Sequence, residues 1–217
     1  MKQFVVGSAF LMFISSLPTG ATDDHTISLQ PVAVVQKVAF MQSYGDTLPP
    51  MGYVIFCREH QADCRPKGPF ADRIQLTTAK FRELKQVNDQ VNTTVIPMTD
   101  LQLYGKVDWW AYPDQNKGDC EDYVLQKRRL LIERGWPQST LLITVVRDEN
   151  NEGHAVLTVR TDAGDFVLDN KRREIVPWIN TPYTFIKEQS QRNPLLWISL
   201  VPPDLAPQPA VSAFNSH

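Results

Sequence analysis

The apolar residues of this 217-residue chain change their spacing once, from a helical to a strand period, which limits the possible folds. Upstream, apolar side chains recur every three or four positions and predict a helix over residues 77–95. Thr77 or Thr78 is placed to cap this helix, and Pro97 stops it. Downstream, short β-branched and alternating runs predict antiparallel strands. Helices followed by an antiparallel sheet define the α+β class.

A second helix is predicted over residues 120–134, just before the period changes. Gly135 stands where a glycine commonly ends a helix, and Pro137 follows it. Between the two helices, residues 100–113 are rich in aromatic side chains and are expected to be irregular. Strands are predicted at 141–146, 154–160 and 165–168, with further short candidates at 175–178, 183–187 and 196–200.

Four segments are predicted along the chain. Residues 1–21 are typical of a signal peptide, because Lys2 precedes an apolar run too short to span a bilayer and small residues end at Ala21. An uncleaved N-terminal anchor is the alternative. The remainder divides into an arm or edge strand, a folded domain and a disordered, proline-rich tail: 22–50, 51–201 and 202–217. A signal peptide implies export, so a periplasmic or secreted protein is expected.

The charge of the chain argues against nucleic acid as a partner. It carries 22 basic and 24 acidic residues, and the two signs are interspersed. No basic face is available to bind a phosphate backbone. Beyond the signal peptide, no apolar run reaches the roughly 18 residues of a membrane-spanning helix. We therefore expect no transmembrane segment in the mature protein.

The three cysteines are best interpreted as one pair and one free thiol. Cys57 and Cys64 lie seven positions apart, and in an oxidising compartment they are predicted to form a disulfide. The alternative is a metal site that also uses His60, but no fourth ligand is evident. A thiol–disulfide oxidoreductase is disfavoured, because the pair lacks the CxxC spacing and Cys120 has no resolving partner nearby.

Cys120 has the setting of a nucleophile. It occupies the first turn of the predicted helix, where free backbone N–H groups and the helix dipole favour the thiolate. Its neighbours are Gly118 and the acidic residues Asp119, Glu121 and Asp122, which is an unusual environment for a thiol that only packs in a core. Its own N–H is the expected oxyanion donor. Trp109 and Trp110 are candidates to line the site, although at least one of them is expected to pack in the core.

A predicted hairpin supplies partners for this thiol. If its turn lies at residues 161–163, the position opposite His154 is Asp169, Asn170 or Lys171. His154 and Asp169 then lie at the same end of two neighbouring strands. A carboxylate there can accept a hydrogen bond from the imidazole and fix its tautomer, which leaves the other nitrogen free to take the thiol proton.

These segments resemble a known family, the bacterial transglutaminase-like cysteine peptidases. The resemblance spans residues 50–200 and rests on Gly118-Asp119-Cys120-Glu121-Asp122-Tyr123, Leu141 to Val146, Gly153-His154-Ala155-Val156-Leu157, Val167-Leu168-Asp169-Asn170, Val87 to Asn92 and Leu103 to Trp110. It implies a papain-like core with Cys120, His154 and Asp169 as the catalytic triad. The best-understood branch contains periplasmic proteases that cut surface adhesins and control biofilm release. In this chain the short segment 111–117 and the cysteine pair depart from that branch and leave the substrate open.

The resemblance also implies a calcium ion beside the nucleophile. The matching acids here are Asp119 and Glu121, with Asp122 as a further candidate. Three carboxylates so close to a thiol would raise its pKa, and a hard divalent cation bound to their oxygens would cancel that repulsion. The alternative is that the acids only answer the helix dipole.

Three functions remain open from the sequence. The first is an endopeptidase acting on a periplasmic or surface protein, and the second is transglutaminase-type acyl transfer through the same thioester. The third is a non-catalytic module that binds calcium or a peptide. The resemblance further allows an inner-membrane receptor, responsive to a cyclic dinucleotide, that sequesters the enzyme.

Overall fold

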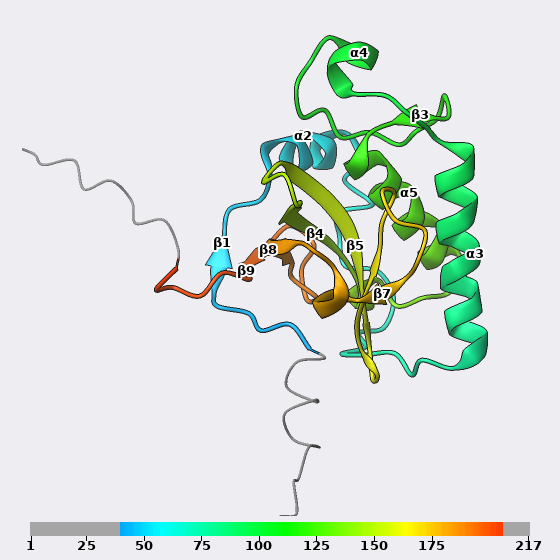
Figure 1. Cartoon of the computed structure of the whole chain (residues 1–217), viewed down its shortest axis with the longest axis vertical. Helices are drawn as coiled ribbons and strands as arrows, with labels where there is room; N and C mark the ends of the chain where they lie inside the picture. The colour runs from blue at the N-terminus through cyan, green and yellow to red at the C-terminus, as the bar shows by residue number, and fades with distance from the viewer. Residues whose placement is uncertain (1–39, 206–217) are drawn as a thin grey trace, which may run out of the picture. The chain divides into compact units, whose positions relative to one another are not determined.

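A seven-stranded antiparallel sheet forms the centre of the computed structural model (Figure 1), which describes residues 40–205. The strand order is β1-β9-β8-β4-β5-β6-β7. The predicted signal peptide, most of the arm and most of the tail lie outside the described residues. The strands are β1 (Asp46–Thr47), β4 (Leu141–Arg147), β5 (Gly153–Thr161), β6 (Gly164–Leu168), β7 (Val176–Pro177), β8 (Thr184–Gln189) and β9 (Trp197–Ser199).

Both predicted helices are confirmed. The first is α3 (Thr78–Thr94), and the side chain of Thr77 accepts a hydrogen bond from Lys80 N at its start. The second is α5 (Cys120–Glu133), which Gly135 follows with a φ of +84°. In Figure 1, α5 packs on β5 and α3 packs on α5 in turn. The α+β class is confirmed, with Cys120 as the first residue of the inner helix.

Alternation along β5 separates two apolar clusters. Ala155, Leu157 and Val159 belong to the larger one, which also includes Val124 and Leu131 of α5. Side chains of the opposite parity belong to a smaller cluster on the other face of the sheet: Val146, Val156, Val167, Tyr183 and Phe185, with Met41 and Leu200. Each face of the sheet therefore carries an apolar cluster, and His154 is a buried polar residue at the start of β5.

Two helices were not predicted. The first is α2 (Met51–Glu59), a nine-residue helix that buries Tyr53 and Phe56. The second is α4 (Asp100–Tyr104), which lies in the segment expected to be irregular. Five residues are too few to show a helical period, and its signal is local instead: Thr99 and Gln102 form a reciprocal capping box. A parallel pair of two-residue strands, β2 (Ile96–Pro97) and β3 (Lys117–Gly118), joins these parts to α5.

All six predicted strands are present: β4, β5, β6 and β8 extend past at least one predicted bound, whereas β7 and β9 are shorter than predicted. β7 covers two residues, because the chain enters a 3₁₀ turn at Trp178. The structure describes the predicted arm only from residue 40, and there Asp46 and Thr47 pair with β9. Within residues 40–205, no helix has the length and apolar character needed to cross a membrane.

The predicted disulfide between Cys57 and Cys64 is confirmed. Both sulfurs are used in this bond, which overturns the alternative metal site with His60. The bond ties the end of α2 to the loop that follows, and both cysteines are buried in the main core.

We expect loss of this disulfide to destabilise the protein. Replacing both cysteines (Cys57→Ala with Cys64→Ala) should lower the free energy of unfolding by about 2–3 kcal/mol, because the short closed loop no longer restricts the unfolded chain. Urea unfolding under oxidising conditions measures the difference. Cys120→Ala, which removes a thiol outside the bond, serves as the control. Equal stability of the double variant and the wild type would contradict the expectation.

Lys127 is the most unusual residue of the core. Its side chain is fully buried on α5, and among residues 40–205 its Nζ has no hydrogen-bond partner. Burial lowers the pKa of Lys127 to about 7, although the charge of Asp169 acts in the opposite direction. A proton on this lysine is therefore held less tightly in the folded than in the unfolded chain.

This difference predicts a stability that depends on pH. Because the folded-state pKa lies below the unfolded value, stability should rise as the pH increases from about 7 to 10. Lys127→Met should be more stable than the wild type by about 3–5 kcal/mol at pH 6, and this advantage should shrink towards pH 10. Chemical unfolding across this range measures it, with the half-exposed Lys85→Met as control. An advantage that does not change with pH would contradict the assignment.

Candidate active site

Cys120 opens α5 at the point where β3 ends. Gly118 is required just before it, because a Cβ there would lie 2.7 Å from the Cβ of Asp122. Cys120 is partly exposed, and its Sγ donates a hydrogen bond to Glu121 Oε2 at 3.0 Å. Burial, and then the Glu121 carboxylate, raise the pKa of the Cys120 thiol well above its ordinary value, although the Ala155 N–H acts against this. Burial and the Glu121 carboxylate therefore outweigh the stabilisation of the Cys120 thiolate by the helix N-terminus.

His154 and Asp169 meet as the sequence predicts. His154 Nε2 lies 2.9 Å from Asp169 Oδ1, and both side chains are almost fully buried. Their pairing is diagonal rather than direct, because β5 and β6 pair Leu157 with Leu168 and the ladder ends there. Continuing this register puts Asp169 opposite Val156, on the same face as His154.

Asp169 is held as a carboxylate. Burial alone would raise its pKa, but hydrogen bonds from His154, Tyr183 and the Lys171 N–H outweigh burial and leave the pKa below its ordinary value. The Lys171 N–H donates to Oδ1 at 3.0 Å, and the Tyr183 hydroxyl donates to Oδ2. Asn92 of α3 donates to the Asp169 backbone carbonyl at 2.8 Å. An ionised Asp169 accepts from His154 Nε2–H, which leaves Nδ1 as the basic nitrogen.

Cys120 and His154 open on the same cleft. This cleft has a volume of about 510 Å³, and its polar lining includes Asp100, Asp119 and Glu121. The remaining lining residues come from the sheet, the start of α2 and the loop after α4: Pro50, Val107, Asp108, Trp110, Val145, Gly153, Ala155 and Lys187. The cleft therefore brings the Cys120 thiol and the His154 imidazole to one open space.

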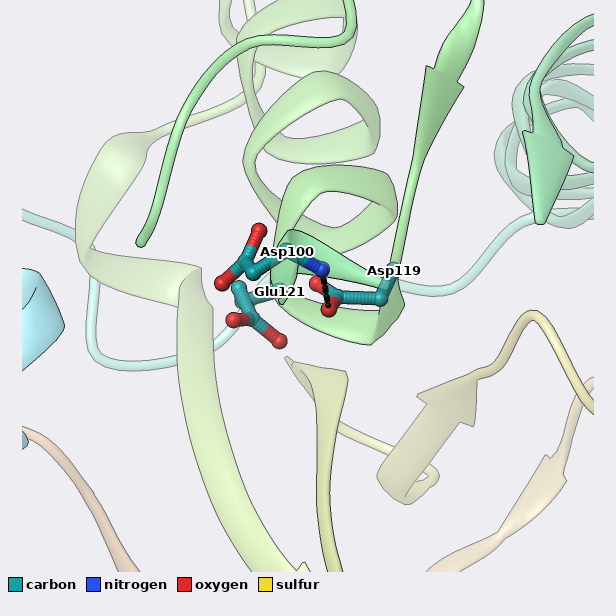
Figure 2. A group of neighbouring side chains, drawn as sticks. All are labelled: Asp100, Asp119 and Glu121. Atoms are coloured by element: carbon teal, nitrogen blue, oxygen red, sulfur yellow. Dashed lines mark hydrogen bonds between the residues drawn. The ribbon is translucent and has the colours of Figure 1, made fainter. Parts of the chain in front are cut away.

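Three carboxylates gather at the start of α5 (Figure 2). One oxygen from each of Asp100, Asp119 and Glu121 lies within 4.8 Å of the others. The Asp100 N–H donates to Asp119 Oδ2 at 3.1 Å, and the other oxygen of Asp119 is buried without a partner among the described residues. Burial raises the pKa of Glu121 to about 9 and that of Asp100 to about 6, with repulsion from Asp119 adding to both. Among residues 40–205, none of these three carboxylates forms a salt bridge.

The acids predicted as metal ligands are only partly brought together. Asp119 and Glu121 belong to the cluster, whereas Asp122 lies outside it. The carboxylate of Asp122 is fully buried and accepts a hydrogen bond from the Ala111 N–H at 2.8 Å. Asp100 takes its place in the cluster. Its only sequence signal is the capping box, which fixes the start of α4.

The two candidate tryptophans have different positions. Trp110 lines the cleft and packs edge-on against Tyr53 and Trp197. Trp109 does not line the cleft. Its backbone N–H donates to Asp100 Oδ2, and the Lys106 ammonium lies 3.2 Å from the centre of its ring. Trp109 therefore supports the acidic cluster, while Trp110 contributes to the wall of the cleft.

A helix that presents a thiol, packed on an antiparallel sheet that carries a histidine–aspartate pair, is the transglutaminase-like α+β core. Residues 43–204 match the family described as bacterial transglutaminase-like cysteine proteinase BTLCP. The chain belongs to this family, which makes it a cysteine peptidase by descent.

Solved structures of LapG from Legionella pneumophila are also similar. The calcium-bound form is 23% identical, with a TM-score of 0.49, and covers 59% of this chain and 73% of that chain. Another LapG structure is 24% identical, with a TM-score of 0.48, and covers 57% and 69%. The EGTA-treated form is 23% identical, with a TM-score of 0.47, and covers 58% and 69%. No curated protein sequence matches the chain.

Proposed function

We propose that this protein is an exported cysteine endopeptidase in which Cys120 is the nucleophile, His154 the general base and Asp169 the residue that orients the base. The observation that carries the proposal is the shared cleft: the free thiol and the histidine held by Asp169 line the same cavity. The family supplies the reaction class, a peptidase acting on a protein.

The reaction follows from these positions. His154 Nδ1 takes the proton of the Cys120 thiol, and the sulfur attacks the carbonyl carbon of a peptide bond. The negative charge moves to the carbonyl oxygen, for which the Cys120 N–H at the helix start is the nearest predicted donor. As the tetrahedral intermediate collapses, His154 returns the proton to the leaving amine and a thioester remains. Water, deprotonated by His154, then releases the acid and restores the thiol.

The proposed location and substrate rest on the sequence. The signal-peptide pattern of residues 1–21 supports export to the periplasm or the medium. The Cys57–Cys64 disulfide agrees with an oxidising compartment. A periplasmic or cell-surface protein is therefore the proposed substrate, and a membrane receptor that controls access remains part of the proposal.

Replacing the nucleophile tests this function. Cys120→Ala should abolish cleavage of at least one exported protein and leave the fold intact, because it removes the sulfur alone. Comparative proteomics of the cell surface and medium, wild type against variant, measures this. Adding a primary amine separates hydrolysis from acyl transfer, since only acyl transfer gives an amine adduct detectable by mass spectrometry. Profiles that do not differ under several growth conditions would sink the proposed function.

The acidic cluster fits a calcium ion. Asp100, Asp119 and Glu121 offer only oxygen ligands, which hard divalent cations prefer. Asp100 Oδ1 and Asp119 Oδ1 are buried without a partner among the described residues, so both are free to coordinate. We propose that these three residues hold calcium. When bound, the cation neutralises the cluster and lowers the pKa of the adjacent thiol.

Calcium binding can be measured directly. In protein stripped with EGTA, added calcium should raise the melting temperature, because a ligand that binds only the folded state stabilises it. Asp100→Asn should weaken calcium binding by more than about tenfold in isothermal titration. Asp122→Asn changes a neighbouring buried acid outside the cluster and should retain binding. Loss of binding in Asp122→Asn alone would instead favour the ligand set predicted from the sequence.

A further inference from the structure

We infer that Tyr183 is a positioning residue that fixes the tautomer of His154 by locking the Asp169 carboxylate. This inference deepens the proposed function and rests on it for its catalytic meaning. From the sequence, Tyr183 is predicted only as part of a short strand at 183–187. It immediately precedes β8, and β8 pairs with β4, so a third strand segment joins the site.

The contacts of Asp169 define the role of Tyr183. Asp169 Oδ1 is used twice, by His154 Nε2 and by the Lys171 N–H. Asp169 Oδ2 accepts from the Tyr183 hydroxyl, the one protein donor to this oxygen within residues 40–205. Because Asp169 is 2% exposed, water cannot readily replace that donor. The two oxygens therefore have different partners, and the carboxylate cannot rotate without breaking a buried hydrogen bond.

Tyr183 is itself held in place. Its ring meets the imidazole of His154 edge-on, with 5.5 Å between ring centres. The Tyr183 side chain also packs in the smaller apolar cluster of the sheet, which includes Val146 and Phe185. Burial, and then the Asp169 carboxylate, raise the pKa of Tyr183 above its ordinary value, so the hydroxyl stays protonated and can only donate to Asp169. One side chain thus contacts both the base and the residue that orients it.

Removing this hydroxyl has a specific chemical consequence. In Tyr183→Phe the ring keeps its packing, but Asp169 Oδ2 is left buried without a donor, which drives the carboxylate to rotate or to take up a proton. Either change weakens its bond to His154 Nε2–H. The competing tautomer, with the proton on Nδ1, then becomes populated. That tautomer cannot accept the thiol proton at Nδ1.

The test combines NMR with thiol chemistry and needs no substrate. Nitrogen-15 spectra of protein labelled at histidine report the tautomer of each ring, and His154→Ala assigns the signals of His154. The wild type should show the Nε2–H form, and Tyr183→Phe should show a mixture. With calcium added to wild type and variant alike, alkylation of Cys120 by iodoacetamide at pH 7 should slow by about 3- to 10-fold in the variant, which corresponds to the loss of one hydrogen bond.

Tyr123→Phe is the matched control. Tyr123 is also buried, and its hydroxyl donates to the Val95 carbonyl at 2.6 Å, away from Asp169. This control should lose stability like Tyr183→Phe while keeping the wild-type tautomer and alkylation rate. Equal slowing in both variants, or an unchanged tautomer in Tyr183→Phe, would overturn the inference.

The wild-type spectrum gives a second test that does not depend on whether Tyr183→Phe folds. An Nδ1–H tautomer for His154 in the wild type would overturn the inference by itself. Failure of the proposed function has a different signature. Wild-type Cys120 would then react no faster than a free cysteine even with calcium added, while the tautomer would still respond to the loss of the Tyr183 hydroxyl.

Discussion

Buried negative charge at the start of α5 is the constraint on which the rest of the site depends. Asp119 and Glu121 flank the thiol, and Asp100 is brought to them by α4. A helix N-terminus offers roughly half a positive charge, which is too little for three carboxylates and a thiolate. These groups must therefore hold protons or share a cation. In the present state Glu121 accepts a hydrogen bond from the Cys120 thiol, which is the group that has to ionise.

The other half of the site, the His154–Asp169 pair, does not lack partners for its charge. Each oxygen of Asp169 has a donor, and its backbone carbonyl is bound by Asn92 of α3. This half is complete as it stands, so the imidazole is oriented before any substrate arrives. The proposed site thus combines an imidazole that is already oriented with a thiol whose ionisation depends on the charge of its surroundings.

Residues whose signals are periodic or local could be predicted from the sequence. The bounds of α3 and α5 follow from apolar spacing and from Thr77 and Gly135, and the His154–Asp169 pair follows from hairpin geometry. The places of Asp100 and Tyr183 in the site could not be predicted. Each lies in a short segment whose neighbours in space are distant in sequence: α4 approaches α5 across 19 positions, and Tyr183 reaches Asp169 only because β8 pairs with β4. Such contacts depend on tertiary packing, which no local pattern encodes.

The two halves also differ in how they are attached to the fold. Asp169 accepts hydrogen bonds from α3, from the loop after β6 and from the residue before β8. Its geometry therefore requires the assembled sheet. The acidic cluster is built by one stretch, residues 100–121, joined through β2 and β3 at its base. None of its three acidic residues lies in a strand of the seven-stranded sheet. A cation bound there, as proposed, would therefore act on the Cys120 thiol and leave the His154–Asp169 pair in place.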